Sequence, residues 1–252
     1  MSDTVTGDCT LFIADLHLSD ERPLTIGRFF HFLEHTAKSA QALYILGDLF
    51  EYWVGDDDTH SQVAEQTARR IHTLVQSGTP VYFMHGNRDF LLASNYAARC
   101  RMQLLNDPCV IDLYGTPTLL MHGDSLCTDD IQYQQLRHWL RKPWLQTLLR
   151  SLPLGLRHQI AHRARNGSRR AKNAKPAEIM DVNQTAVTHA LLESGLNRLI
   201  HGHTHRPAHH VIDVDNQPRE RWVLPDWYER DGKIIGGALC CTPEACRLLG
   251  LD

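Results

Sequence analysis

"NRLIHGHTHRP", residues 197–207, is an apolar run followed by three histidines within five positions. The apolar part has the length of a buried strand, and Gly202 and Pro207 mark the loop that follows. A polar surface loop is one interpretation, because the chain holds 16 histidines. A metal site is the other, because neutral imidazole is the commonest metal ligand near pH 7.

Four further runs share this design of a short apolar stretch that ends in polar residues. They are "TLFIADLH" (10–17), "ALYILGDL" (42–49), "PVYFMHGNRD" (80–89) and "PTLLMHGD" (117–124). Helical spacing of apolar residues falls between several of them, at 24–40, 60–77 and 178–194, and a glycine follows each of the last two. Strands that alternate with helices predict an α/β fold. Beyond residue 207 the pattern changes to a hairpin that turns at Asp231-Gly232.

Each of the five predicted strands is followed directly by side chains of the types that bind metal ions in proteins. In α/β sheets the carboxyl ends of the strands form the ligand-binding edge, so we expect these side chains to meet. Seven oxygen and nitrogen ligands exceed the needs of one ion and suit two ions that share a carboxylate. The absence of thiolate favours Mn, Fe, Mg, Co or catalytic Zn over a structural zinc site. The candidate ligands are Asp15, His17, Asp48, Asn87, His122, His203 and His205.

The order Asp-x-His, Gly-Asp, Gly-Asn-Arg-Asp, His, Gly-His-x-His over residues 11–206 resembles the calcineurin-like metallophosphoesterase family. The resemblance implies a β-sandwich flanked by helices, in four α/β/β/α layers, with two metals at the strand ends. It implies that Asp48 bridges the ions. One ion is then held by Asp15, His17, Asp48 and His205, and the other by Asp48, Asn87, His122 and His203.

Arg88 follows Gly-Asn, where many members of that family carry a histidine. An alkoxide leaving group needs a proton, whereas a phosphate monoester leaves as an anion and needs only charge neutralisation. Arginine cannot donate a proton at neutral pH but binds phosphate oxygens bidentately. The residue therefore favours a pyrophosphate substrate, although a plain ion pair between Arg88 and Asp89 is the alternative.

Composition is that of a folded globular protein, with 42% hydrophobic and 22% charged residues in a chain of 252. Seven cysteines occur without a Cys-x-x-Cys pair, so we expect reduced thiols. The net charge is only -3, yet residues 131–177 carry eleven Lys or Arg and no Asp or Glu. This segment also contains Trp139, Trp144 and many leucines. An apolar and cationic surface favours an anionic amphiphile or a membrane face, while nucleic acid is the weaker alternative.

We therefore expect one metallophosphoesterase domain, 1–252, with a helical cap inserted at 127–180. The stretches "GDLFEYWVGDD" (47–57), "MHGDSLCTDD" (121–130) and "AEIMDVN" (177–183) resemble a lipid A-pathway branch of the family. That resemblance implies Mn²⁺-dependent cleavage of UDP-2,3-diacylglucosamine at the α-phosphorus, by a monomer on the cytoplasmic face of the inner membrane and without nucleic acid. A dinucleoside polyphosphate hydrolase, another small phosphodiesterase or a nuclease of the same fold stays open.

The same resemblance implies the residues that act on the substrate. Asn87, Arg88 and His203 are the expected catalytic residues, with Arg88 and His203 neutralising phosphoryl oxygens. Lys172 departs from the branch, which often has Asn at that place. The expected substrate-binding residues are Asn87, Arg88, Asp130, Ser168, Lys172, Lys175 and His203.

Overall fold

The computed structural model describes residues 9–174 and 181–251, the side chains of 169–174 excepted. Its strands form two main sheets, of order β13-β12-β1-β2-β3-β4 and β5-β6-β7-β9-β8, and a small β10-β11 hairpin. The strands are β1 Thr10–Ile13, β2 Ala42–Leu46, β3 Val81–Met84, β4 Gln103–Leu105, β5 Cys109–Leu113, β6 Thr116–Met121, β7 Arg198–His201, β8 Ala208–Val214, β9 Gln217–Val223, β10 Tyr228–Arg230, β11 Lys233–Ile235, β12 Gly237–Cys241 and β13 Cys246–Gly250. The helices are α1 Pro23–His31, α2 Gln62–Gln76, α3 Ser94–Cys100, α4 Ile131–Leu140, α5 Pro143–Ser151, α6 Leu154–Ala174 and α7 Gln184–Ser194.

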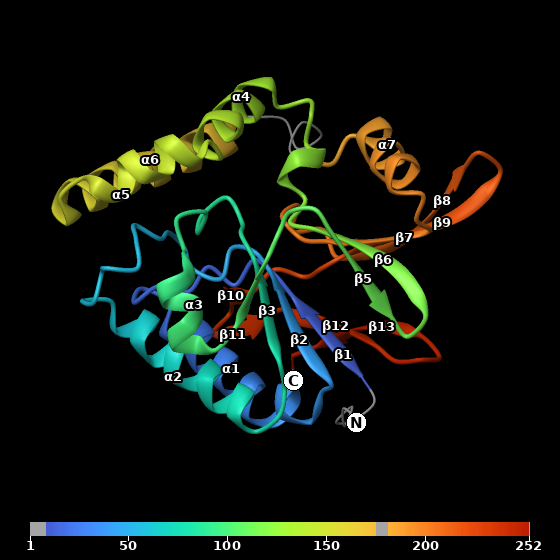
Figure 1. Cartoon of the computed structure of the whole chain (residues 1–252), viewed down its shortest axis with the longest axis horizontal. Coiled ribbons are helices and arrows are strands. Elements are labelled where there is room, and N and C mark those ends of the chain that lie inside the picture. The colour runs from blue at the N-terminus through green and yellow to red at the C-terminus, as the bar shows by residue number, and fades with distance from the viewer. Residues whose placement is uncertain (1–8, 175–180, 252) are drawn as a thin grey trace.

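Three hydrophobic cores lie between four layers. Alternation along β1 sends Leu11 and Ile13 to the core shared with α1, α2 and α3, and Phe12 to the core between the two sheets. The third core joins β6 and β7 to α7 through residues such as Leu199 and Leu191. Figure 1 shows the sheets stacked in this way, with α1–α3 on one outer face and α7 by the other. The chain is thus an α/β/β/α sandwich, as predicted.

The five predicted strands are confirmed, and they are divided between the sheets. β1, β2 and β3 are parallel neighbours in the first sheet, whereas β6 and β7 are parallel neighbours in the second. The chain beyond residue 207 contributes to both sheets, because β8 and β9 join the second whereas β12 and β13 extend the first. The hairpin at Asp231-Gly232 is also confirmed, by β10 and β11.

The predicted helices are confirmed with small changes at their ends. α1 continues as a π-helix, Phe32–Thr36, and a 3-10 turn, Ala37–Ser39, so the helical stretch covers most of 24–40. α7 begins at Gln184, capped by Asn183, and ends at Gly195 in the left-handed conformation. The 178–180 part of that prediction lies outside the described residues.

The helices α4, α5 and α6 stand apart from the sandwich, above the first sheet in Figure 1. Ion pairs fasten α6 to the loop after β2. Arg157 pairs with Asp57, and Arg165 donates to Glu51 over 2.8 Å. Both arginine side chains are buried, so their charges are shielded from water in these contacts.

Two further findings concern the chain as a whole. Cys241 and Cys246 form a disulfide between β12 and β13, so the expectation of reduced thiols is wrong at these two positions. Among the described helices, none combines the length and the apolarity that crossing a membrane requires.

Candidate metal centre and its two cavities

The loops that follow β1, β2, β3, β6 and β7 bring the seven candidate ligands into one cluster. Asp48 lies in its middle: Oδ2 is 3.9 Å from His17 Nε2, and Oδ1 is 3.9 Å from His122 Nε2. Asp15 Oδ1 is 3.6 Å from His205 Nε2, on the His17 side of the cluster. On the other side, Asn87 Oδ1 is 3.2 Å from His122 Nε2, and the rings of His122 and His203 are 5.1 Å apart. Asp15 also belongs to both groups, because its carboxylate lies within 4.8 Å of ligand atoms of Asp48 and His122 as well as of His17 and His205. Two central carboxylates, Asp48 and Asp15, therefore face both groups of ligands.

Five of the seven candidate ligands have left-handed backbone, with φ between 51° and 69°. They are Asp15, His17, Asp48, His203 and His205. L-residues rarely adopt this conformation, although Asp and His tolerate it better than most. Such strain persists only where the surrounding structure enforces it, and it gathers at functional sites. The fold therefore holds these loops in an unfavourable backbone conformation, which places the five side chains at the centre.

Two glycines leave room for the carboxylates. A Cβ on Gly86 would lie 2.1 Å from Asp48 Oδ1, and one on Gly202 would lie 2.5 Å from Asp15 Oδ2. No real Cβ approaches another atom so closely. Glycine at these two positions therefore lets the backbone lie close to the carboxylates of the centre.

The cluster fits divalent cations on its own chemistry. Asp15 Oδ1 and His17 Nε2, which face the centre, are buried and lack hydrogen-bond partners among the described residues. Burial raises the pKa of Asp48 to about 7. The His122 imidazole lowers this pKa, whereas the neighbouring carboxylates of Asp89 and Asp15 raise it further. Carboxylates that are buried side by side are hard to ionise without a cation between them. Bound metal would satisfy both the orphaned atoms and the charge.

A second set of contacts orients the imidazoles. His205 Nδ1 is 3.0 Å from Asp226 Oδ2, His17 Nδ1 is 3.6 Å from Glu51 Oε2, and His122 Nδ1 lies 2.8 Å from the Leu46 carbonyl. Each contact leaves Nε2 for the centre, which is how metal-binding histidines are held. Sequence reasoning gave no role to Glu51, although it lies in the stretch 47–57, or to Asp226, because their contacts with the histidines exist only in the folded chain.

Arg88 links the metal loops to the cap. Its backbone N–H donates to Asp48 Oδ1 over 2.8 Å, and its Nη2 donates to Ser168 of α6 over 3.5 Å. The Asp89 carboxylate instead accepts from the backbone N–H groups of Gly86 and Leu49, each over 2.8 Å. Asp89 thereby holds the loops after β2 and β3 together. The Arg88 guanidinium points instead to α6, where it contacts Ser168.

The remaining candidate substrate residues are placed unequally. Asp130 accepts a hydrogen bond from Tyr133 N over 3.1 Å and caps α4. Lys172 lies in the last turn of α6, with its side chain outside the described part of the chain. Lys175 lies outside the described residues altogether.

Tyr133 of α4 reaches the centre and was missed by sequence reasoning. Its ring stacks near that of His203, with centroids 6.1 Å apart and planes at 24°. Its hydroxyl donates to the buried Asp124 over 2.7 Å, and Arg137 donates to the same carboxylate over 2.8 Å. This latch fixes α4 against the loop after β6.

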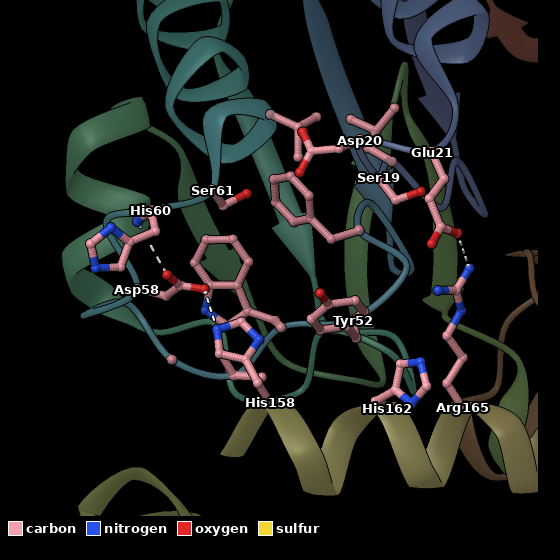
Figure 2. Close-up of a pocket in the computed structure, with 16 residues that line it drawn as sticks. Ser19, Asp20, Glu21, Tyr52, Asp58, His60, Ser61, His158, His162 and Arg165 are labelled. Atoms are coloured by element: carbon pink, nitrogen blue, oxygen red, sulfur yellow. Dashed lines mark hydrogen bonds and ion pairs between the residues drawn. The ribbon is translucent and has the colours of Figure 1, made fainter. Parts of the chain in front are cut away.

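Two cavities lie under the cap. The apolar cavity, of about 230 Å³, opens beside Asn87 and Arg88 and is lined chiefly by Leu136, Leu140, Leu149, Ile160, Ala161 and Ala164. The histidine cavity, of about 320 Å³, is lined among others by Ser19, Tyr52, Asp58, His60, His158 and His162 (Figure 2). Both share Tyr52, Trp53, Val54 and Arg165, so they are neighbours.

Not every apolar side chain of the cap lines a cavity. Trp139 and Trp144 are 55% and 58% exposed, and their rings contact each other with centroids 6.4 Å apart. Leu148 and Leu156 are also largely exposed, on the neighbouring helices. An exposed group of large apolar residues is typical of a binding surface.

Comparisons with known proteins agree with this geometry. Residues 10–207 match the family model of calcineurin-like phosphoesterases. The chain is 52% identical to a UDP-2,3-diacylglucosamine hydrolase of Escherichia coli O7:K1 over 226 residues, covering 90% of this chain and 93% of the relative. It is 50% identical to the hydrolase of the same name from Aromatoleum aromaticum, covering 87% and 89%. A solved archaeal phosphodiesterase, 12% identical, shares the fold at a TM-score of 0.50, covering 96% of this chain and 99% of that one. The chain belongs to the calcineurin-like phosphoesterase family.

Proposed function

We propose that this chain hydrolyses the pyrophosphate bond of UDP-2,3-diacylglucosamine, a step of lipid A biosynthesis. Water attacks the α-phosphorus, and the products are UMP and 2,3-diacylglucosamine 1-phosphate. The observation that carries the proposal is the apolar cavity, which opens beside the Arg88 guanidinium at the edge of a phosphoesterase centre. The identity to two hydrolases of this substrate, over nine-tenths of the chain, supports it. A dinucleoside polyphosphate would leave the apolar cavity without a role.

The centre is proposed to hold two Mn²⁺ ions. Asp15, His17, Asp48 and His205 would hold one ion, and Asp48, Asn87, His122 and His203 the other. The place of Asp48, at 3.9 Å from both His17 and His122, supports its role as the bridge. When bound, two such ions lower the pKa of water and stabilise charge on phosphoryl oxygens.

Arg88 supplies the fixed positive charge at the reacting phosphates. Its planar guanidinium suits the oxygens of a leaving phosphate, which needs no proton. Its position is fixed by the backbone bond to Asp48 and by Ser168 of the cap.

His203 is proposed to act beside Arg88, both as a metal ligand and at the phosphoryl oxygens. Burial lowers the pKa of His203 to about 3, and the neighbouring His122 imidazole contributes in the same direction. A neutral imidazole can hold a metal ion through one nitrogen and donate a hydrogen bond to a phosphoryl oxygen through the other, so His203 is proposed to assist Arg88 at the developing charge.

Residues 127–180 are proposed to act as a cap over the acyl chains. Leucines and isoleucine in the apolar cavity would bury methylenes, each contributing about 0.8 kcal/mol. The exposed Trp139 and Trp144, in a segment rich in cations, would rest on the cytoplasmic face of the inner membrane. The chain would work there as a monomeric peripheral protein, with Ser168, Asp130, Lys172 and Lys175 near the sugar and phosphate.

The test is direct. The metal-depleted protein is incubated with UDP-2,3-diacylglucosamine in detergent, with and without Mn²⁺, and UMP is measured by chromatography. UMP formation that requires Mn²⁺ supports the proposal. Hydrolysis of single-stranded DNA or of a dinucleoside polyphosphate in place of the lipid nucleotide would refute it.

A further inference from the structure

The helix α6 separates two cavities of opposite character. His158, His162 and Arg165 line the histidine cavity, at the i, i+4, i+7 spacing of one helix face. Ile160, Ala161 and Ala164 line the apolar cavity from the adjacent face. A substrate with a lipid end and a polar end therefore meets a matching pair of cavities under the same helix.

The histidine cavity borders the metal centre through two chain segments. Ser19 lies two residues after the candidate ligand His17, and Tyr52 follows Glu51, the residue 3.6 Å from His17 Nδ1. A short bridge between Leu18 and Phe50 ties these segments together. The cavity thus begins directly beside the candidate ligands, on the His17 side.

The lining of the histidine cavity favours a neutral polar group over a phosphate. Asp20, Glu21 and Asp58 supply carboxylates, whereas Arg165 is the one fixed cation among its described lining residues and is already paired with Glu21 and Glu51. An anion would be repelled here. Hydroxyl and imide N–H groups would find acceptors, as ribose hydroxyls do at carboxylates in nucleotide-binding folds.

The cavity also offers a flat surface and an orphaned polar atom. Tyr52 is 38% exposed, and the His158 ring meets it edge-on at 6.1 Å while its Nε2 lies 3.0 Å from Asp58. The Ser19 hydroxyl is buried without a hydrogen-bond partner among the described residues. Figure 2 shows Ser19, Tyr52, His158 and His162 around this space. At about 320 Å³ it falls in the range of small-ligand sites.

We propose that the histidine cavity binds the uridine of the nucleotide substrate, while the apolar cavity takes the acyl chains. The proposal rests on the proposed function, because it assumes a substrate in which a nucleoside and a diacyl sugar flank one pyrophosphate. The phosphates then lie between the cavities, at the metal centre and Arg88. Tyr52 stacks on the uracil, and carboxylates of the cavity accept from the ribose.

The test replaces an exposed residue on the cavity face of α6. His162→Trp would fill the cavity, and Gln159→Trp, three residues earlier on α6 and outside the lining of both cavities, is the matched control. Calorimetric titration with UMP is run on the Mn²⁺-loaded protein. We expect His162→Trp to weaken UMP binding at least tenfold and to raise the KM for the lipid nucleotide relative to that for bis-p-nitrophenyl phosphate. Gln159→Trp should match the wild type in both. Equal UMP affinity in His162→Trp and wild type would overturn the proposal.

A second measurement does not depend on the variants. Irradiation with 5-azido-UMP, followed by peptide mass spectrometry, should label the peptides that carry Tyr52 or His158–His162. Label found solely on other peptides would overturn the proposal. A wild-type chain that binds UMP in this cavity but does not cleave UDP-2,3-diacylglucosamine would refute the proposed function alone.

Discussion

Gly86→Ala is expected to damage the metal centre without unfolding the protein. The new Cβ would lie 2.1 Å from Asp48 Oδ1 and 2.3 Å from Asp48 N, where real Cβ contacts start near 3.0 Å. Asp48 and the loop after β2 must therefore move by about 1 Å, and a misplacement of this size costs roughly 100-fold in rate, or about 2.7 kcal/mol of transition-state stabilisation. Asp48 is also the proposed bridge, so metal content should fall with the rate.

The matched control is Gly27→Ala, inside α1, where an added Cβ meets nothing within 4 Å. Alanine is the better helix former there, so this variant should keep full activity and gain about 0.5–1 kcal/mol of stability. The assay compares kcat/KM for UDP-2,3-diacylglucosamine, metal content by elemental analysis, and Tm. A Gly86→Ala protein with wild-type kcat/KM and two bound metals would show that the crowding around Asp48 is not what positions it.

Four other outcomes are expected. Asp48→Asn should lose activity and at least one metal by elemental analysis, and two retained metals would contradict the bridge. Arg88→Lys should keep its metals but lose about 100-fold or more in kcat, because a point charge replaces a planar fork, and wild-type kcat would remove Arg88 from the transition state. Leu140→Ser should raise KM for the diacyl substrate about tenfold in detergent, because Leu140 lines the apolar cavity. Trp139→Ser should instead weaken binding to anionic vesicles, because Trp139 is exposed. The reverse pattern would exchange the roles of the two residues. Burial lowers the pKa of His201 to about 4, so below pH 6.5 the unfolded chain takes up a proton that the folded chain does not. Through His201 alone, acidification from pH 7 to pH 5 should therefore lower the free energy of unfolding of the metal-free protein by about 2 kcal/mol. In urea titrations, His201→Gln should lack this contribution to the loss of unfolding free energy. A pH dependence of stability equal to that of the wild type would refute the role given to His201.

Much of the fold was predictable, because short apolar runs and glycine caps are local signals. The runs at 10–17, 42–49 and 80–89 became β1, β2 and β3, and Gly195 ended α7. The apolar runs did not show how the five strands would be divided between the two sheets. Which buried strand pairs with which is decided by the packing of Phe12, Leu120 and their neighbours between the sheets, and that packing is long-range.

The candidate ligands were predictable because each follows a strand that the sequence reveals. The contacts behind them were not, since Asp226 meets His205 only after β9 has returned the chain to the centre. The roles of the cap residues were also hidden. Trp139 and Leu140 are both large and apolar, and the sequence did not show that the first would be exposed to solvent and the second would line the apolar cavity.

The left-handed backbone at five candidate ligands bears on how the centre is to be probed by mutagenesis. Left-handed conformation costs an ordinary L-residue about 1–2 kcal/mol, and asparagine is among the few that bear it well. An alanine scan would therefore combine two losses, the ligand and the backbone preference, in one number. It would overstate the energetic value of each metal bond at Asp15 and Asp48 in particular. Asparagine is the substitution that removes the charge there and leaves the loop its shape.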